Sequence, residues 1–263
     1  MRRAQLFETV DQPWMPESIR DSIVESLSRT LEWGRMLRGV VAPFRTFLER
    51  TGAREVLDIA SGAGGPPLVL VRELIAAGVE PPRFLLTDLY PRVEAWQRAV
   101  LEQPDLLSFV PEPVDASAIP AGVAEGRARI VINAFHHFDP DLAQSVLDDA
   151  VRARAGVFVS EIFERNPLRA VSVAPVGIAA ALTNPFVTAK QPIEKALLTW
   201  LVPAVIVAGA WDAVVSTLRS YSERELRAMA ERTGGDFEWT YGTYTFEPFG
   251  RGYYFYGVPT RHR

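Results

Sequence analysis

The stretch "VLDIASGAGGPPL", residues 56–68 of this 263-residue chain, decides the fold. Its apolar start is typical of a buried strand, and Asp58 leads into a loop of small residues. Pro66 and Pro67 then stand where a helix would begin, and the first turn of a helix tolerates proline. Strand, glycine loop and helix start together offer free backbone N–H groups to a nucleotide-like ligand. A tight strand-to-helix turn without a ligand is the plainer alternative.

Two phosphate-binding fingerprints fail in this loop. Gly62 and Gly64 fit the first half of a dinucleotide fingerprint, but Pro67 occupies the place of the third glycine. No Gly-Lys-Ser/Thr follows, so the loop is not a P-loop. The sequence therefore favours a cofactor without a pyrophosphate. An NAD-dependent reductase is further disfavoured because the chain has no Tyr-x-x-x-Lys pair.

Composition sets broad limits on function. A hydrophobic content of 48% with 23% charged residues is typical of a globular protein with a sizeable core. The net charge of -4 gives no electrostatic reason to expect nucleic acid or an anionic membrane as partner. The absence of cysteine excludes disulfides and thiolate metal sites. The N-terminal stretch lacks a signal-peptide core, so we expect a cytoplasmic protein.

The rhythm of apolar residues predicts an α/β fold. Apolar strands at 55–60, 83–90, 128–135 and 155–163 alternate with helices, which indicates a doubly wound, mostly parallel, Rossmann-like sheet. Two amphipathic helices are expected within 16–50, with a kink at Pro43. A helix should begin after Asp139, another after a capping box of Ser222 and Glu225. The aromatic tail predicts an antiparallel hairpin that turns at the glycines of "FGRG" (249–252).

The loop resembles motif I of the class I S-adenosylmethionine (SAM) dependent methyltransferases. The segment "DIASGAG" (58–64) has the family's acidic residue followed by spaced small residues, with Ala60 in place of the first glycine. We expect this change to be mild if the loop need only be small there. "PVDASAIP" (113–120) and "INAFHHFDP" (132–140) resemble the third and fourth motifs, in order and at predicted strand ends. SAM carries no phosphate, so prolines at the helix start cost it little.

The resemblance implies a set of cofactor contacts. One group of residues would hold the amino-acid end of SAM, and others the ribose, the adenine and the sulfonium. These are Asp58, Ser61, Gly62, Gly64 and Gly65 for the amino-acid end; Asp88 and Leu89 at the ribose; Asp115 and Ala116 at the adenine; and Asn133, Ala134 and Phe135 behind the sulfonium and methyl.

A narrower resemblance extends beyond the cofactor motifs. "DIASGAGGPP", "FHHFDP" and "WDAVVSTLRSYSEREL" look like a bacterial subgroup of these methyltransferases that has an apolar insertion before its C-terminal hairpin. The subgroup's N-terminal pattern is similar to Glu8, Trp14, Pro16 and Arg20 here. Trp14 and Arg20 would then close over the cofactor, with Arg20 pairing its carboxylate. An anchoring tryptophan and a surface arginine are the alternative.

Three residues are candidates for chemistry at the methyl acceptor. His136 and His137 follow a predicted strand end, and either could act as base or orient the acceptor. Glu161 ends the next strand and could bind the acceptor or form a structural salt bridge. The alternative for the histidines is packing against the cofactor and capping the loop. No metal site is expected, because the sequence spacing supplies no third ligand.

Two long uncharged runs, 170–189 and 196–211, precede the last helix. The second is too short for a bilayer and is interrupted by Pro203, so a transmembrane hairpin is disfavoured. A lid that walls an apolar acceptor pocket and a homodimer interface are equally good interpretations. Loose contact with a membrane surface stays open.

These expectations combine into one hypothesis. The chain would divide into an N-terminal helical cap (1–52), a SAM-binding core (53–166), an apolar lid insertion (167–221) and a C-terminal helix and hairpin (222–263) that complete the core. It would transfer a methyl group from SAM to a small, lipophilic acceptor at oxygen, nitrogen or carbon, in bacterial secondary metabolism. A SAM-binding catalyst or biosynthetic assembly partner that transfers no methyl group is the alternative.

Overall fold

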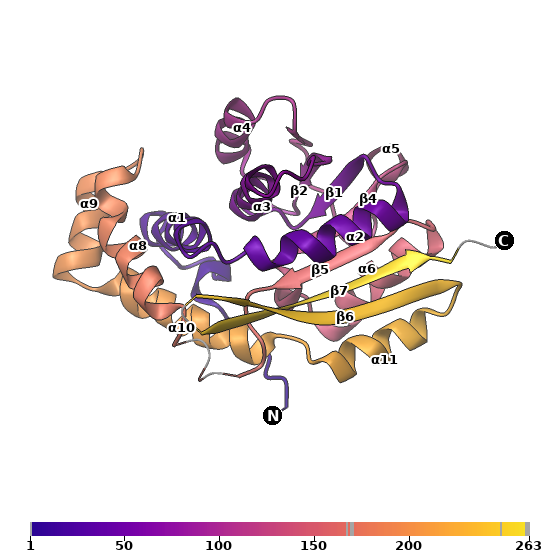
Figure 1. Cartoon of the computed structure of the whole chain (residues 1–263). Coiled ribbons are helices and arrows are strands. Elements are labelled where there is room, and N and C mark those ends of the chain that lie inside the picture. The colour runs from indigo at the N-terminus through magenta and orange to yellow at the C-terminus, as the bar shows by residue number, and fades with distance from the viewer. Residues whose placement is uncertain (1, 167, 169–170, 248, 261–263) are drawn as a thin grey trace.

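The computed structural model describes residues 2–166, 168, 171–247 and 249–260. Within them one sheet has the strand order β3-β2-β1-β4-β5-β7-β6 (Figure 1). Strands β1 to β5 pair in parallel, whereas β7 runs antiparallel to both β5 and β6. The predicted doubly wound sheet and its antiparallel closing hairpin are confirmed. The strands are β1 (Glu55–Ile59), β2 (Arg83–Thr87), β3 (Leu107–Phe109), β4 (Ala128–Ile132), β5 (Val157–Glu161), β6 (Phe237–Phe246) and β7 (Gly250–Pro259).

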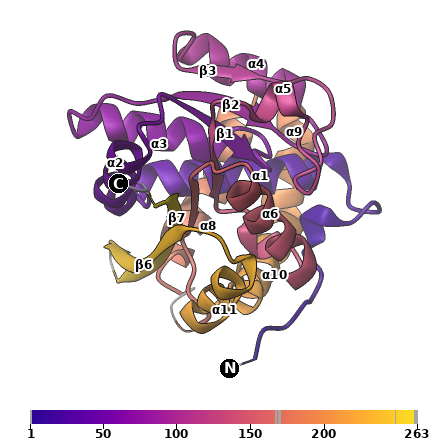
Figure 2. The ribbon, with the colours of Figure 1, turned by 90° about the vertical axis from the view of Figure 1, so that its right-hand side faces the viewer.

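Helices cover the sheet on both faces (Figure 2). The α-helices are α1 (Glu17–Trp33), α2 (Val41–Thr51), α3 (Gly65–Ala76), α4 (Val93–Glu102), α5 (Ala121–Ala124), α6 (Pro140–Arg152), α8 (Ala174–Val187), α9 (Pro192–Ala196), α10 (Ala204–Arg219) and α11 (Glu223–Thr233). Short 3-10 helices are η1 (Thr9–Asp11), η2 (Arg38–Val40) and η3 (Phe135–His137), and η4 (Leu197–Leu201) is a π-helical turn.

The alternation of strand side chains produces two separate cores. Val56 on β1 and Phe158 on β5 point to the face covered by α2 and α3, where the rings of Phe44 and Phe47 pack against that of Phe158. Their neighbours Leu57 and Val159 point to the opposite face, against α6 and α11. A strand that is buried on both sides needs apolar residues at nearly every position, as the sequence showed.

Most predicted helix ends lie where the sequence placed them. The Asp139 carboxylate accepts from the N–H groups of residues 141 and 142 at the start of α6, and Ser222 and Glu225 form the predicted capping box of α11. Pro43 does not kink a helix, because α2 begins only at Val41 and its first turn accommodates the ring.

The glycines of "FGRG" do not make the hairpin turn. Gly250 and Gly252 lie within β7, whereas the described turn residues are 247 and 249, before it. A side chain at Gly252 would collide with the backbone oxygen of Glu161, and one at Gly250 with the ring of Phe246. Close packing, and not turn geometry, therefore requires glycine at both positions.

The apolar insertion packs beside α1, at the left of Figure 1. Ile19 and Ile23 of α1 form a small core with Ala181 of α8 and Val205 of α10. Lys195, fully buried, donates to the Glu25 carboxylate and to Thr188, which fastens α9 to α1. The insertion is thus held by apolar and ionic contacts to the N-terminal helix.

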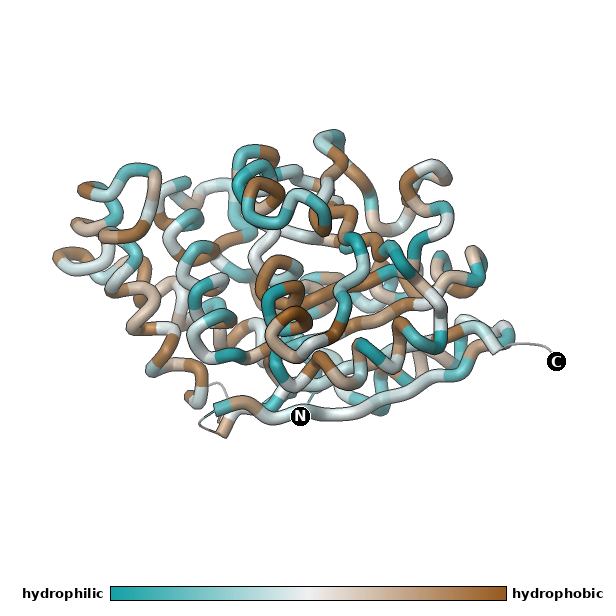
Figure 3. Tube along the Cα trace, turned by 45° about the horizontal axis from the view of Figure 1, so that its top comes forward, coloured by the Kyte–Doolittle hydropathy of each residue, from teal (hydrophilic) through white to brown (hydrophobic). Residues whose placement is uncertain are grey.

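The outer side of the insertion is strongly apolar, and hydrophobic segments recur along it in Figure 3. Phe186, Ile193 and Leu201 are each more than 70% exposed. Among the described residues, no single helix is long and apolar enough to cross a membrane. The consecutive helical segments Pro192–Leu201 and Ala204–Arg219, bent by 74°, reach that length and composition only together.

Candidate active site at the carboxyl edge of the sheet

The loop after β1 is shaped by three left-handed residues. Gly62 and Gly64 have φ angles of 54° and 79°, which glycine adopts freely. Ala60 also has a positive φ, 59°, which costs an L-residue about 1–2 kcal/mol. The substitution at this position is therefore not mild, because backbone conformation as well as size favours glycine there.

The loop's glycines differ in what surrounds them. A side chain at Gly62 would meet no atom within 4 Å among the described residues, so its backbone faces open space. One at Gly64 would lie 3.2 Å from the indole of Trp96. At Gly65 it would collide with Ser28 of α1, so packing of α1 against α3 already explains this glycine.

Asp58 is a buried carboxyl with an unsatisfied oxygen. It is 1% exposed, and no described residue forms a hydrogen bond with its Oδ2. Burial raises its pKa to about 8, the charge of Asp88 adds to the shift, and Ser61 opposes it. Ser61 also binds the backbone of Thr87, which ties the loop to β2. A cation next to Oδ2 would restore the ionised form.

The ends of β2 and β3 hold the next predicted residues. The Asp88 carboxylate accepts from the N–H groups of Gly62 and Tyr90, both at 2.8 Å, and so braces the motif loop. Leu89 beside it is exposed. Asp115, also exposed, accepts from the backbone and hydroxyl of Ser117, and these bonds lower its pKa. The neighbouring Ala116 is partly buried.

The loop after β4 is held in place by hydrogen bonds and ring packing, and it forms the bottom of the candidate site. Asn133 has a φ of 56°, and its side-chain oxygen accepts from the N–H of Ile162 at 3.4 Å, which joins the ends of β4 and β5. Ala134 and Phe135 are buried, and the Phe135 ring packs against Tyr221. Because β1 and β4 are neighbours in the sheet, this floor lies beside the motif loop. Sheets of this kind bind ligands where the strand order reverses, between these two strands.

His136 and Glu161 form a buried pair. The Glu161 carboxylate accepts from the His136 backbone N–H at 3.0 Å and lies 2.7 Å from Nδ1 of the ring. Burial by itself lowers the pKa of His136, but Glu161 and Glu8 outweigh it and raise the pKa to about 10. The ring therefore carries its second proton at neutral pH in the metal-free chain.

Glu8 joins this pair from the far N-terminal end of the sequence. Burial alone raises its pKa, but His137, His136 and Arg219 together lower it to about 2. Its carboxylate lies 3.5 Å from Nε2 of each histidine and 3.4 Å from Nη1 of Arg219. Sequence spacing supplied no third ligand for a metal, but the fold brings Glu8 to both histidines.

Helix α10 holds the N-terminal segment in this position. Asp212 accepts from the backbone N–H of Thr9 at 2.5 Å and from its hydroxyl at 2.7 Å. Trp211 donates to the Phe7 carbonyl, and Arg219 to the His137 carbonyl. The stretch "WDAVVSTLRSY" thus anchors the N-terminal segment. The resemblance to a subgroup motif singled out this stretch but did not show that role.

Two predicted N-terminal contacts lie at the edge of this network. Arg20 donates to the carbonyls of Val10 and Gln12 and so holds the bend before α1. Trp14 is 64% exposed.

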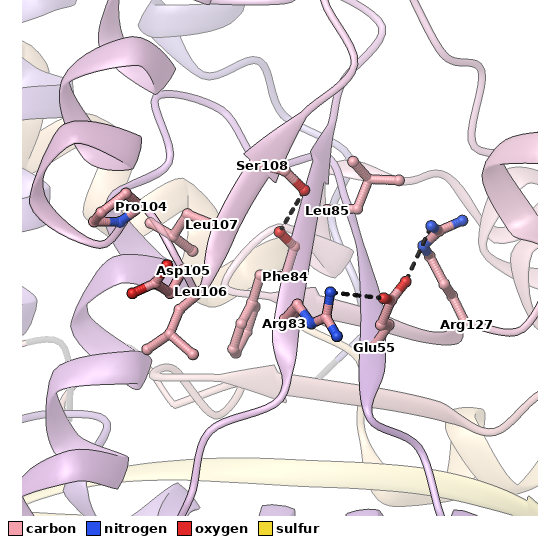
Figure 4. Close-up of a pocket in the computed structure, with 10 residues that line it drawn as sticks. All are labelled: Glu55, Arg83, Phe84, Leu85, Pro104, Asp105, Leu106, Leu107, Ser108 and Arg127. Carbon is pink, nitrogen blue, oxygen red and sulfur yellow. Dashed lines mark hydrogen bonds and ion pairs between the residues drawn. The ribbon is translucent and has the colours of Figure 1, made fainter.

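Two cavities lie at the opposite, amino edge of the sheet. One of about 370 Å³ surrounds Glu55, which pairs with Arg83 and Arg127 (Figure 4). A wider groove of about 1430 Å³ runs along the starts of β1, β4 and β5. Neither touches the motif loops, and ligands of parallel sheets bind at the other edge, so we do not assign the active site to either.

Neither protein-family models nor curated protein sequences match this chain. Among solved structures, the plantazolicin methyltransferase BpumL, in complex with SAH, is similar with a TM-score of 0.57 and 11% identity over 96% of this chain and 95% of that chain. NcsB1, an O-methyltransferase from neocarzinostatin biosynthesis, has a TM-score of 0.53 and 14% identity over 93% of this chain and 59% of its own. The chain has the class I methyltransferase fold.

Proposed function

We propose that the chain is a SAM-dependent methyltransferase acting on a small, lipophilic acceptor. The observation that carries the proposal is the unsatisfied, buried Asp58 oxygen behind the motif loop. The amino-acid end of SAM carries an ammonium group, which supplies the cation that this carboxyl lacks. The open space in front of Gly62 gives the ligand room to approach.

The remaining predicted contacts follow the same edge of the sheet. When bound, SAM supplies an electrophilic methyl group on its sulfonium. Asp88 and Leu89 would meet the ribose, Asp115 and Ala116 the adenine, and Asn133, Ala134 and Phe135 would support the sulfonium, while Asp58, Ser61, Gly62, Gly64 and Gly65 would hold the amino-acid end. Arg20 would contribute by holding the N-terminal bend on which Trp14 could close over the cofactor.

The two histidines would have different roles at the acceptor. His136 is buried and already protonated, so it is suited to orient groups and not to accept a proton. His137 is about one-third exposed and lies beside it, with ring centroids 4.3 Å apart. We therefore favour His137 as the base for an oxygen or nitrogen acceptor, with Glu161 positioning His136.

The acceptor class is inferred from the insertion. Exposed apolar side chains on α8 to α10 support a lipophilic acceptor or a second copy of the chain as the group that covers them. NcsB1 was solved with 2-hydroxy-5-methyl naphthoic acid, a small aromatic acid, on a related fold. The acceptor atom and the dimer stay open in this proposal.

Calorimetric titration with S-adenosylhomocysteine, with NAD as control, tests the cofactor. We expect micromolar binding of the first and none of the second. Screening lipophilic acceptors by mass spectrometry for the gain of one methyl group then tests transfer. His137→Gln should lose turnover while still binding S-adenosylhomocysteine. Cofactor binding without transfer to any acceptor would favour the non-methylating alternative, and no binding by the folded chain would overturn the proposal.

A further inference from the structure

Two histidine nitrogens converge on one carboxylate beside the proposed active site. Nε2 of His136 lies 3.5 Å from Oε1 of Glu8, and Nε2 of His137 lies 3.5 Å from Oε2. One ligand atom from each of the three residues lies within 4.8 Å of the others. Both His136 and Glu8 are at most 3% exposed, so the atoms meet inside the protein.

The opposite nitrogen of each ring is held by a second carboxylate. Nδ1 of His136 lies 2.7 Å from Glu161, and Nδ1 of His137 lies 3.2 Å from Asp11. In metal sites, a ligating histidine commonly donates its other N–H to a carboxylate, which fixes the tautomer and turns a lone pair toward the ion. Both rings have this arrangement.

The 3.5 Å separations suit ligands that share a cation. They exceed the usual range of a direct N–H···O hydrogen bond, about 2.7–3.2 Å. Ligands about 2.0–2.1 Å from a tetrahedral zinc ion are about 3.3–3.4 Å from one another. The two nitrogens lie about this far from different oxygens of Glu8, so a small rotation of the carboxylate would present one oxygen to an ion that both rings share.

The local charge also admits a divalent ion. Three carboxylates, of Glu8, Asp11 and Glu161, surround the two rings, and Arg219 is the fixed cation that contacts Glu8 and Asp11. A divalent ion would therefore enter a cluster in which carboxylates outnumber the fixed cation that contacts them.

We propose that Glu8, His136 and His137 bind a divalent transition-metal ion, zinc by preference, which clamps the N-terminal segment to the loop after β4. Two imidazole nitrogens and one carboxylate are a known zinc donor set, and a fourth position is left for water or another small ligand. Binding of the ion requires neither SAM nor an acceptor, so this proposal and the proposed function fail in separate experiments; His137 would act as the base only while its Nε2 is free of the ion.

Zinc titration of the full, tag-free, metal-stripped chain tests the proposal. We expect one zinc ion per chain with micromolar or tighter affinity, and a higher Tm with zinc than with chelator. Cobalt(II) should give the intense visible absorption of a tetrahedral site. Absence of zinc binding by the folded chain would overturn the proposal.

Variants separate the site from incidental binding. Glu8→Gln and His137→Gln should each weaken zinc binding by about 100-fold, and Asp11→Asn, which only orients a ligand, by about tenfold. Glu49→Gln makes the same chemical change on the exposed side of α2 and should leave binding unchanged. His137 is partly exposed, so its variant should fold even where a change at buried His136 would not. Equal zinc affinity in wild type, Glu8→Gln and His137→Gln would contradict the site.

Discussion

Two buried carboxyl groups, Asp58 and Glu8, lie at the same edge of the sheet in opposite electrostatic states. Asp58 is 1% and Glu8 3% exposed, so burial alone raises the pKa of both. The pKa of Asp58 rises to about 8, whereas that of Glu8 falls to about 2. The two carboxyl groups differ in the charges that surround them. Glu8 faces two histidines and Arg219, whereas Asp58 faces another carboxylate, Asp88.

The difference indicates how each region is completed. The cluster around Glu8 contains its own positive charges, which offset the cost of burying its carboxylate. The motif loop contains no positive charge next to Asp58. A ligand with an ammonium group would supply that charge and stabilise the ionised carboxylate. The predictions below test this contrast.

The largest loss of stability should follow from removal of the Glu161 charge, which pairs with His136 in the Glu8 region. Glu161→Gln leaves the buried imidazolium of His136 without its closest counter-charge, and removal of one partner of a buried ion pair costs about 3–5 kcal/mol. Urea denaturation should show a loss of about 3 kcal/mol. Glu49→Gln, at an exposed pair, should change stability by less than about 0.5 kcal/mol. Equal effects of the two changes would mean that burial of the pair does not matter.

Replacement of the Asp58 carboxyl, which can ionise when a cation binds beside it, should weaken ligand binding and spare the fold. At pH 7 this carboxyl already carries its proton in the free protein, so Asp58→Asn should change the free energy of unfolding little. Binding of S-adenosylhomocysteine should weaken by about tenfold or more, because a charged hydrogen bond contributes about 1.5–3 kcal/mol. Asp105→Asn, at the amino-edge cavity, is the matched control. A loss in the control and not in Asp58→Asn would move the binding site to the other edge.

Proton release sharpens the same comparison. Asp58 binds its proton more tightly when folded than unfolded, so its contribution to stability is present below about pH 4 and is lost as pH rises to about 8. An ammonium group beside it should lower the pKa again and expel the proton. We expect up to about 0.9 proton released per ligand at pH 7, measured by calorimetry in buffers of different ionisation enthalpy. Asp58→Asn should release none, and proton uptake by wild type would contradict the assignment.

The smallest effect concerns the backbone of the motif loop. Ala60→Gly relieves a left-handed alanine but loosens the unfolded chain, so we expect a net stabilisation of about 0.5–1 kcal/mol in thermal unfolding. Ala63→Gly, in the same loop and without a positive φ, should destabilise instead. A destabilised Ala60→Gly would show that the methyl group of Ala60 makes a packing contribution larger than its strain.

Local patterns predicted most of the fold, whereas the cofactor contacts came from the family resemblance and stay predictions. Apolar runs gave β1, β2, β4 and β5, and capping residues gave the starts of α6 and α11. Short β3 was not predicted, since three residues carry too little pattern. Glu8 was noticed only as part of an N-terminal pattern, because its histidine partners lie far along the chain. A third ligand beside His136 and His137 could not be found from spacing.

The sequence by itself determined the parallel sheet, the glycine loop and the acidic residues at its strand ends, because these depend on periodicity and on neighbours a few positions away. Only the tertiary structure decided that Oδ2 of Asp58 has no hydrogen-bond partner among the described residues, that Gly65 serves packing against Ser28, and that α10 holds the N-terminal segment over the two histidines. Charge state and ligand geometry depend on burial and on groups distant in sequence, and those are fixed only when the chain has folded.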